Sequence, residues 1–304
     1  MAIVSVRTIE KGDETMSPKK ATVCVVAAGS MWGTISIFVR HLDGIGLSAM
    51  QICFVRTLVA LVVLFFALLL FRRDLLRISI KDVPIFICTG VFSYALFGTS
   101  YFMSVATGEV AVAAVLLYTS PIFVMIFSVL LFHEPLTKWK IMALLSTCTG
   151  CVFVSGILWG TISVPLFAIV TGLAAGFFYS TYSVFGHYAL QKHHPVTIAF
   201  YTFAFAVLAL LPFSEPTTLV QALLASPQSL WHVVGIALVC TVFPYGLYTL
   251  GLKHMETSKA AILATAEPLV GASMGILIFG EALTIVKFVG MVLIVSSIFL
   301  LNHR

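Results

Sequence analysis

The chain has 304 residues, of which 60% are hydrophobic and only 10% are charged, and its formal net charge at pH 7 is +5. A soluble domain carries roughly 25% charged residues because its surface must be hydrated, so this composition excludes a soluble globular protein and makes the lipid bilayer the expected partner. No Lys/Arg run is interleaved with aromatic residues, which excludes nucleic acid as a partner.

The first twenty residues are polar and of mixed charge, which predicts a cytoplasmic tail over residues 1–20. Met16 offers a second start site, so translation from Met1 and from Met16 both stay open. The apolar run at 21–39 resembles a signal peptide, but it is a full span long and further apolar runs follow it. We therefore expect a first transmembrane helix rather than a cleaved leader.

Apolar runs continue through the rest of the chain, and a membrane-crossing helix needs about 20 such residues. We predict ten spans, near residues 21–39, 48–71, 83–105, 109–132, 139–158, 163–187, 195–213, 232–252, 258–279 and 284–301. The stretch 141–191 has no Asp, Glu, Lys or Arg and is too long for one helix. We place its break at residues 159–161, before Pro165.

The distribution of basic residues predicts the orientation, because cytoplasmic loops are enriched in Lys and Arg. With the N-terminus inside, fourteen of the 17 Lys and Arg residues lie in cytoplasmic segments. Arg40 and Lys287 lie outside, and Arg56 lies within a span. This bias predicts a multi-pass protein of the inner (plasma) membrane with both termini in the cytoplasm.

The sequence repeats itself at an offset of 147 residues. This offset aligns the following pairs: Tyr101 with Tyr248, Glu109 with Glu256, Pro121 with Pro268, Glu134 with Glu281, and Lys140 with Lys287. Each half then holds five spans, and because five is odd the second half enters the membrane upside down. Inverted repeats are typical of secondary transporters, whose substrate sites lie near the midplane where the repeats meet.

Two segments carry a family resemblance: TSPIFVMIFSVLLFHEPLT at 119–137 and AEPLVGASMGILIFGEALT at 266–284. They resemble the repeated signature of the EamA-type transporters of the drug/metabolite transporter superfamily, and ICFVRTLVALVV at 52–63 resembles that family's Arg-bearing second span. The resemblance covers about residues 21–301. His133 departs from it, since Gly is usual before the Glu of the first repeat.

The resemblance implies ten helices, two EamA domains, a central cavity and export of small metabolites such as amino acids. Together with the repeat, it predicts an all-α membrane protein with ten transmembrane helices, arranged as two inverted-topology five-helix repeats around a central cavity. We place the first repeat at 21–158 and the second at 159–304.

Glu267 is the strongest candidate for function, because an ionisable group near the middle of a span is costly to bury. Pro268 beside it donates no backbone hydrogen bond and is expected to leave the Ala264 carbonyl free. Such a pair of acceptors suits an ammonium group or a proton. A structural Glu bonded to a neighbouring hydroxyl is the alternative.

The matching position in the first repeat is Ser120, before the helix-breaking Pro121. One half therefore offers a carboxylate and the other a hydroxyl. Arg56 lies too deep in its span for an interfacial anchor, and both a pairing with Glu109 and a contact with a substrate carboxylate stay open. Ser36 adds a further hydroxyl on the first span.

Aromatic side chains on the first, third and fourth helices of the two halves are further candidates for the lining of a site. They are Trp32, Tyr94, Tyr101, Tyr118, Tyr179, Tyr182 and Tyr248. Aromatic residues in membrane proteins are more often interface anchors, but Tyr94 and Tyr182 lie well inside their spans, so a cavity-facing role stays open for them. Glu134 and Glu281, which end the fourth helix of each half, are interpreted as structural.

No cofactor or metal is expected. Cys148 and Cys151 form a C-x-x-C within an apolar segment without polar partners, and we interpret them as small packing residues. The sequence contains no G-x-x-x-x-G-K-[ST] motif, the phosphate-binding loop that ATP-driven proteins use. It also contains no nucleophile motif that would indicate an enzyme.

The expected function is therefore secondary transport of a small-molecule substrate by alternating access, with export of an amino acid or a similar amphoteric solute preferred. Efflux of lipophilic cations and uncoupled facilitation by the same fold are the alternatives. Proton coupling, the direction of transport and a monomeric or homodimeric state stay open.

Overall fold

The computed structural model describes residues 16–157 and 165–302, and over these residues it is helical without strands. Eight helical segments in this part of the chain are long and apolar enough to cross a membrane. They are Pro18–Gly44, Ala49–Phe71, Ile80–Thr107, Val110–Phe132, Leu166–Leu190, Pro195–Phe213, Pro227–Leu252 and Thr257–Phe279. The predicted break at 159–161 lies outside the described residues.

Two of the ten predicted spans are not among these eight. They form α9 (Lys138–Ser155) and α17 (Ile285–Asn302). Lys138 and Lys140 lower the hydropathy of α9, and the apolar run of α17, Ile285–Leu301, is a short one. Composition in α9 and length in α17 therefore distinguish these two helices from the eight long apolar segments.

Several spans of the first half are interrupted helices. The helices of this half are α2 (Pro18–Gly33), α3 (Ile35–Gly44), α4 (Ala49–Phe71), α5 (Val83–Ile87), the π-helix η3 (Cys88–Ala95), α6 (Leu96–Thr107), α7 (Val110–Leu117), α8 (Ser120–Phe132) and α9. Short 3₁₀ turns, η1 (Arg73–Leu76) and η2 (Ile80–Asp82), join α4 to α5.

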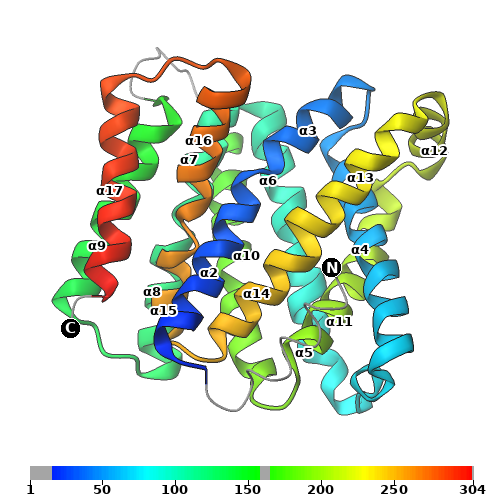
Figure 1. Cartoon of the computed structure of the whole chain (residues 1–304), viewed down its shortest axis with the longest axis horizontal. Helices are drawn as coiled ribbons and strands as arrows, with labels where there is room; N and C mark the ends of the chain where they lie inside the picture. Colours follow the sequence, from blue (N-terminus) through cyan, green and yellow to red (C-terminus); the bar gives the residue numbers. More distant parts are fainter. Residues whose placement is uncertain (1–15, 158–164, 303–304) are drawn as a thin grey trace.

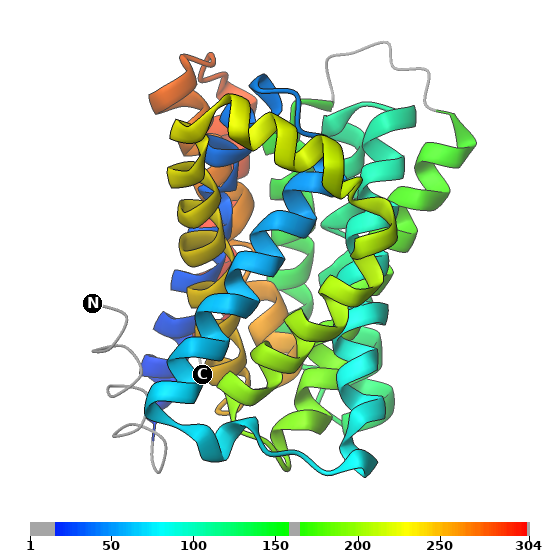
Figure 2. The same ribbon diagram turned by 90° about the vertical axis from the view of Figure 1, so that its right-hand side faces the viewer.

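The second half contains α10 (Leu166–Leu190), α11 (Pro195–Leu210), α12 (Pro216–Ala225), α13 (Leu230–Ala237), the π-helix η7 (Leu238–Val242), α14 (Phe243–Leu252), α15 (Thr257–Leu263), α16 (Ala266–Phe279) and α17. The 3₁₀ turns η5 (Leu211–Phe213) and η6 (Pro227–Ser229) flank α12. Figure 2 shows α12 lying across one end of the bundle.

The helix boundaries repeat at the offset found in the sequence. Adding 147 to the bounds of α9 gives 285–302, the bounds of α17, and adding it to α8 gives 267–279, which α16 covers. The π-helices η3 and η7 also overlap at this offset, and both fourth spans are broken just before their proline. The two halves therefore share local structure as well as sequence.

The halves interleave in space. Helix α2 of the first half packs mainly against α14 and α16 of the second, and α10 of the second half packs mainly against α6, α7 and α8 of the first. In Figure 1, α2 lies beside α14 and α16, and the start of α2 and the end of α17 lie at the same, lower end of the bundle. Any site between the halves is thus lined by both.

Helices α9 and α17 pack side by side in opposite directions, through small residues. The Ser146 hydroxyl donates to the Leu293 carbonyl at 2.8 Å, and Thr147 donates to Ser297 at 2.7 Å. A Cβ added at Gly150 would lie 2.8 Å from the Gly290 carbonyl oxygen, and one added at Gly290 would lie 2.8 Å from that of Gly150. Small residues thus permit close helix packing in lipid.

The ends of α8 and α16 use the same backbone conformation with different residues. His133 has φ 55° and Gly280, its repeat equivalent, has φ 68°. After each, the Glu amide donates to a carbonyl of the preceding turn: Glu134 to Ser128 at 3.1 Å and Glu281 to Gly275 at 3.0 Å. Only glycine adopts this left-handed conformation without a steric cost.

Replacing His133 by Gly is therefore expected to stabilise the protein by about 1 kcal/mol, the usual cost of a left-handed non-glycine residue. The melting temperature in detergent should rise by a few degrees. The matched control, Gly280→Ala, introduces the cost at the equivalent position and should lower it. An unchanged or lower melting temperature in His133→Gly would mean that the imidazole makes a compensating contact.

Candidate functional site

The third helical segment of each half contains one π-helix, η3 in the first half and η7 in the second. These π-helices position aromatic residues in the interior. Tyr94 lies within η3, and Tyr245 lies in the first turn of α14, directly after η7. Tyr94 is 1% exposed and Tyr245 is 6% exposed. A π-helical turn widens the helix and is frequent at functional sites.

The rings around Tyr245 form an aromatic cluster, which we define as Trp32, Tyr94, Tyr179, Tyr182, Phe203, Tyr245 and Tyr248. The Tyr245 ring centre lies 5.1 Å from that of Tyr182 and 5.3 Å from that of Trp32. The Trp32 ring lies 6.4 Å from that of Tyr179. Edge-to-face pairs at such distances are favourable, so the cluster joins α2, η3, α10, α11 and α14.

Hydrogen bonds hold three of these phenols in place. The Tyr94 hydroxyl lies 2.9 Å from the Thr57 hydroxyl, and the Tyr182 hydroxyl lies 2.9 Å from that of Thr249. The Tyr248 hydroxyl lies 2.6 Å from that of Ser183. Each buried polar group is thereby satisfied, and the rings present fixed faces.

Arg56 lies against one side of the aromatic cluster. Its guanidinium carbon is 5.7 Å from the centre of the Tyr94 ring, which is within cation–π range. The side chain is 9% exposed and lies within electrostatic range of Tyr245 and Cys240. The alternative pairing with Glu109 is not found, because Glu109 is exposed at the start of α7 and Arg56 faces the rings.

Glu267 lies on the other side of the cluster, in the first turn of α16 after the break that follows α15. Its carboxylate is within electrostatic range of Arg56 and within hydrogen-bonding reach of the Tyr179 phenol. The Tyr101 and Tyr118 side chains also lie within electrostatic range of the Glu267 carboxylate. The start of a helix favours a negative charge, so the break between α15 and α16 positions this carboxylate.

Accessibility differs between the two sides. Glu267, Tyr101, Tyr118 and Tyr179 are half-buried, whereas Arg56 and most of the cluster rings are buried. Helix α2 approaches the break closely, since a Cβ added at Gly33 would lie 2.6 Å from the Glu267 carbonyl oxygen. The carboxylate is thus the more accessible charge of the pair.

One local prediction is wrong. The Ala264 carbonyl is not free, because the Glu267 amide donates to it at 3.1 Å. In a regular helix the amide of residue 268 would donate to the Ala264 carbonyl, and Pro268 has no such amide. The chain tightens at the break, however, and the Glu267 amide donates to this carbonyl instead. The structure therefore offers one acceptor at Glu267, the carboxylate.

The remaining residues that were predicted to line a site differ in how they are placed relative to the aromatic cluster. Tyr101 joins the cluster through Phe97, whose ring lies 6.2 Å from that of Tyr101 and 5.1 Å from that of Tyr179. Ser120 is buried at the start of α8, beside Pro121. The buried Ser36 hydroxyl has no hydrogen-bond partner among the described residues.

Sequence reasoning missed Phe203 and Tyr245 as members of the cluster. The repeat equivalent of Tyr245 is Gly98, so the repeat gave Tyr245 no support. Phe203 lies on an ordinary apolar helix, and nothing in its local sequence distinguishes it. No group of His, Cys, Asp and Glu among the described residues is arranged to hold a metal ion.

Comparison with known proteins gives consistent results. The EamA-like transporter family model matches residues 19–156 and again residues 166–303. An uncharacterized transporter of Archaeoglobus fulgidus is 30% identical over 275 residues, covering 90% of this chain and 93% of the relative.

Two relatives carry names that state a substrate. The pseudopaline exporter CntI of Pseudomonas aeruginosa is 26% identical over 285 residues, covering 94% of this chain and 96% of that protein. The threonine/homoserine exporter RhtA of Escherichia coli is 25% identical over 215 residues, covering 68% of each chain. A solved crystal structure shares the fold, with a TM-score of 0.77, 18% identity, and coverage of 93% of this chain and 96% of that one.

Proposed function

The chain belongs to the EamA-like transporter family, and from this membership we propose that it exports an amino acid or a similar small amphoteric metabolite by alternating access. Members of this family are transporters rather than enzymes, and this chain is a multi-pass membrane protein. The substrate class, the direction and the residues of the site are our proposals.

The observation that carries the proposal is the presence of opposite charges, Glu267 and Arg56, beside one aromatic cluster. We assign Glu267 to the substrate amine or to a coupling proton, and Arg56 to a substrate carboxylate. The rings of Trp32 and the tyrosines present faces for an apolar body. A zwitterion needs an acceptor, a donor and an apolar surface, and these groups supply all three.

Other substrate classes fit less well. A sugar needs several paired amide and carboxylate groups, and a phosphorylated compound needs several buried cations. Arg56 lies over the ring of Tyr94, whereas the cation–π contacts of Arg40 and Lys138 involve rings outside the aromatic cluster. The relatives named as exporters include one of threonine and homoserine, which are amphoteric.

We further propose ten spans in inverted-topology repeats with both termini in the cytoplasm and a central cavity between the halves. The antiparallel packing of α9 and α17 supports this, because repeat-related helices that run in opposite directions belong to units of opposite orientation. Counting α9 and α17 as spans brings the eight long apolar segments to ten. The Lys/Arg bias supports the orientation.

Reconstitution tests the function. Purified protein in proteoliposomes should exchange at least one labelled amino acid from a broad panel, with and without an imposed pH gradient. A rate that follows the gradient indicates proton coupling, and an unaffected rate indicates a facilitator. Transport of lipophilic cations without any amino acid would replace this proposal with drug efflux, since the cluster and Glu267 also suit a cation.

Cysteine labelling tests the proposed orientation of the chain in the membrane. In intact cells, a cysteine introduced at Ser226, between α12 and η6, should react with a membrane-impermeant maleimide. A cysteine at Ser79, at the start of η2, should react only after the cells are permeabilised. Both positions lie in loops, so burial in the membrane does not explain a difference. Reaction of position 79 in intact cells would reverse the orientation.

A further inference from the structure

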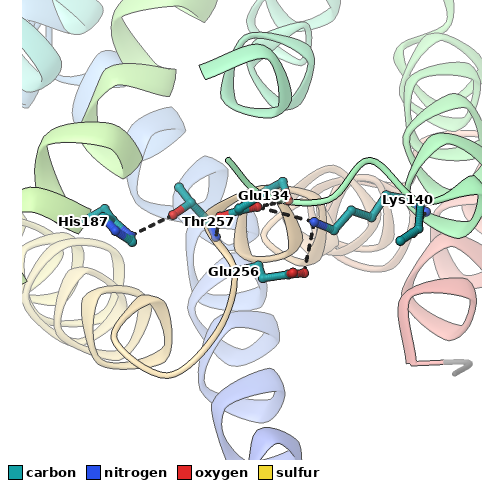
Figure 3. Close-up of polar contacts among 7 residues, drawn as sticks. Glu134, Lys140, His187, Glu256 and Thr257 are labelled. Carbon is teal, nitrogen blue, oxygen red and sulfur yellow. Dashed lines mark hydrogen bonds and ion pairs between the residues drawn. The ribbon is translucent and has the colours of Figure 1, made fainter. Parts of the chain in front are cut away.

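A cluster of polar side chains joins the two halves at the lower end of the bundle in Figure 1, and Figure 3 shows it in detail. The Glu134 carboxylate, just after α8, accepts from the Thr257 amide at 2.6 Å and from the Ser258 amide at 3.2 Å. It also accepts from the Ser258 hydroxyl. A residue of the first half thus caps the start of α15 in the second, where unpaired amides favour an anion.

Two basic side chains complete this arrangement. Lys140 lies 3.5 Å from Glu134 and 3.0 Å from Glu256, and His187 Nδ1 lies 3.1 Å from the Thr257 hydroxyl (Figure 3). The side chains of Glu134 and Lys140 are 8% and 6% exposed. We call these residues the Glu134 cluster, and it links the end of α8, α9 and α10 to the start of α15.

Every member of the Glu134 cluster has a repeat equivalent near the opposite end. At the offset of 147 they are, in order, Glu281 for Glu134, Lys287 for Lys140, Arg40 for His187, Glu109 for Glu256, Val110 for Thr257 and Ala111 for Ser258. We call these the Glu281 cluster. The charges of the carboxylates and of the lysine are the same, so the ion pairs and the capping of backbone amides are chemically available at both ends.

The Glu281 cluster makes only one of those contacts, the ion pair between Glu281 and Lys287 that corresponds to the one between Glu134 and Lys140. Glu281 binds Arg40 at 2.9 Å and Lys287 at 3.3 Å, and its side chain is 39% exposed. Burial acts to raise the pKa of the Glu281 carboxyl, but these hydrogen bonds outweigh it and the pKa lies below its ordinary value. Within the described ranges, no side chain caps the start of α7, and Glu109 has no ion-pair partner.

The helices differ in the same way. Helix α8 packs against α15 beside the Glu134 cluster, whereas the equivalent helices α16 and α7 make little contact. Helix α15 is also buried along its length, and α7 begins at exposed residues. Sequence symmetry therefore coexists with one closed end and one loosened end.

From this asymmetry we infer that Glu134 and Glu281 are alternating gate carboxylates. In the conformation described here Glu134 caps α15. In a second conformation, Glu281 leaves Arg40 and caps the start of α7, Lys287 binds Glu109, and Glu134 releases α15. This inference rests on the proposed transport function for its purpose, but its conformational content is independent of the substrate.

The two closures are not equally strong. Thr257 and Ser258 contribute hydroxyl contacts to the Glu134 cluster, whereas Val110 and Ala111 offer only backbone amides. The inferred second conformation therefore lacks two side-chain contacts of the first. Without substrate, the protein should rest mainly with the Glu134 end closed.

Distances between spin labels test the inference without any substrate. After replacement of the six native cysteines, one label pair at Ala106 and Leu283 reports the Glu281 end. The repeat-related pair at Lys253 and Leu136 reports the Glu134 end. None of these four positions belongs to either cluster. The wild-type distances should be long at the Glu281 end and short at the Glu134 end.

Glu134→Gln should lengthen the distance at the Glu134 end and shorten it at the Glu281 end in a new population. The ratio of the two populations should change on the order of tenfold or more, because charge-assisted hydrogen bonds are lost. Ser258→Ala, a milder variant that removes one hydroxyl, should shift the ratio in the same direction by less. Glu281→Gln should remove the short label distances at the Glu281 end, because Glu281 is inferred to cap α7 in the second conformation.

Identical distance distributions in wild type, Glu134→Gln and Ser258→Ala, all eluting as folded protein, would overturn the inference. A shift at the Glu134 end without any closure at the Glu281 end would also overturn it. Failure of the proposed substrate class is separable, because the distances would still respond when no amino acid is transported.

Discussion

Glu267→Gln is expected to abolish substrate transport, or to lower its initial rate by at least about 30-fold, while the protein still folds. Removing one partner of a buried charged contact usually costs 2–5 kcal/mol, and the amide keeps the size of the side chain. The carboxylate lies at the start of α16, within electrostatic range of Arg56 and within hydrogen-bonding reach of the Tyr179 phenol. Initial rates in proteoliposomes measure the effect.

The matched control is Asp43→Asn, which removes a carboxylate from an exposed position at the end of α3 and should leave the rate unchanged. Tyr179→Phe keeps the ring and removes the phenol, so a smaller loss is expected. If Glu267 binds a coupling proton rather than a substrate amine, Glu267→Gln should retain exchange of substrate for substrate but lose its response to pH. Wild-type rate and pH response would leave Glu267 with a structural role.

Gly29→Ala is expected to prevent normal folding or to destabilise the protein by about 3 kcal/mol, near the upper end of the usual cost of overpacking. A Cβ at this position would lie 2.4 Å from the Ala264 carbonyl oxygen. This oxygen belongs to the backbone at the break before α16, so no side-chain rotation relieves the clash. Yield of folded protein and melting temperature in detergent measure the effect.

Gly246→Ala is the control, because α14 leaves open space there and no atom lies within 4 Å of the added Cβ. Alanine also favours a helix interior more than glycine does, so Gly246→Ala should be neutral or slightly stabilising. Equal behaviour of the two variants would mean that α2 moves away from the break at little cost. The site geometry described above would then tolerate more variation than we infer.

Much of the fold could be predicted from the sequence because lipid imposes simple rules. Long apolar runs identify eight of the segments directly, and the repeat of Pro121 at Pro268 and of Glu134 at Glu281 aligns the two halves. The rules are less decisive for α9, where Lys138 and Lys140 lower the hydropathy, and for the short apolar run of α17. Packing between these two helices, rather than hydropathy, holds them together.

The candidate site could be predicted in part. Glu267 and Arg56 are conspicuous because charges are rare in spans, and most of the predicted tyrosines lie near them. The π-helices could not be predicted, because the additional residue in such a turn leaves no pattern in an apolar sequence. Tyr245 was missed because its repeat equivalent is Gly98, and Phe203 because its local sequence is that of an ordinary apolar helix. The predicted free carbonyl of Ala264 was wrong because the chain tightens locally.

The interpretation of Glu134 as structural illustrates a different limit. Its position at the end of α8 could be read from the sequence, but its partners at the start of α15 lie more than a hundred residues away. Capping across the halves depends on their relative placement, which no local pattern encodes. Comparing Glu134 with Glu281 reveals the difference between the two ends.

The contact between Ser146 and Leu293 has an evolutionary consequence. These two positions are equivalents in the repeat, so each helix presents the same position to the other, as at the centre of an isologous dimer interface. Under the inverted topology proposed above, a single five-helix ancestor inserted in both orientations would form this interface between two identical subunits.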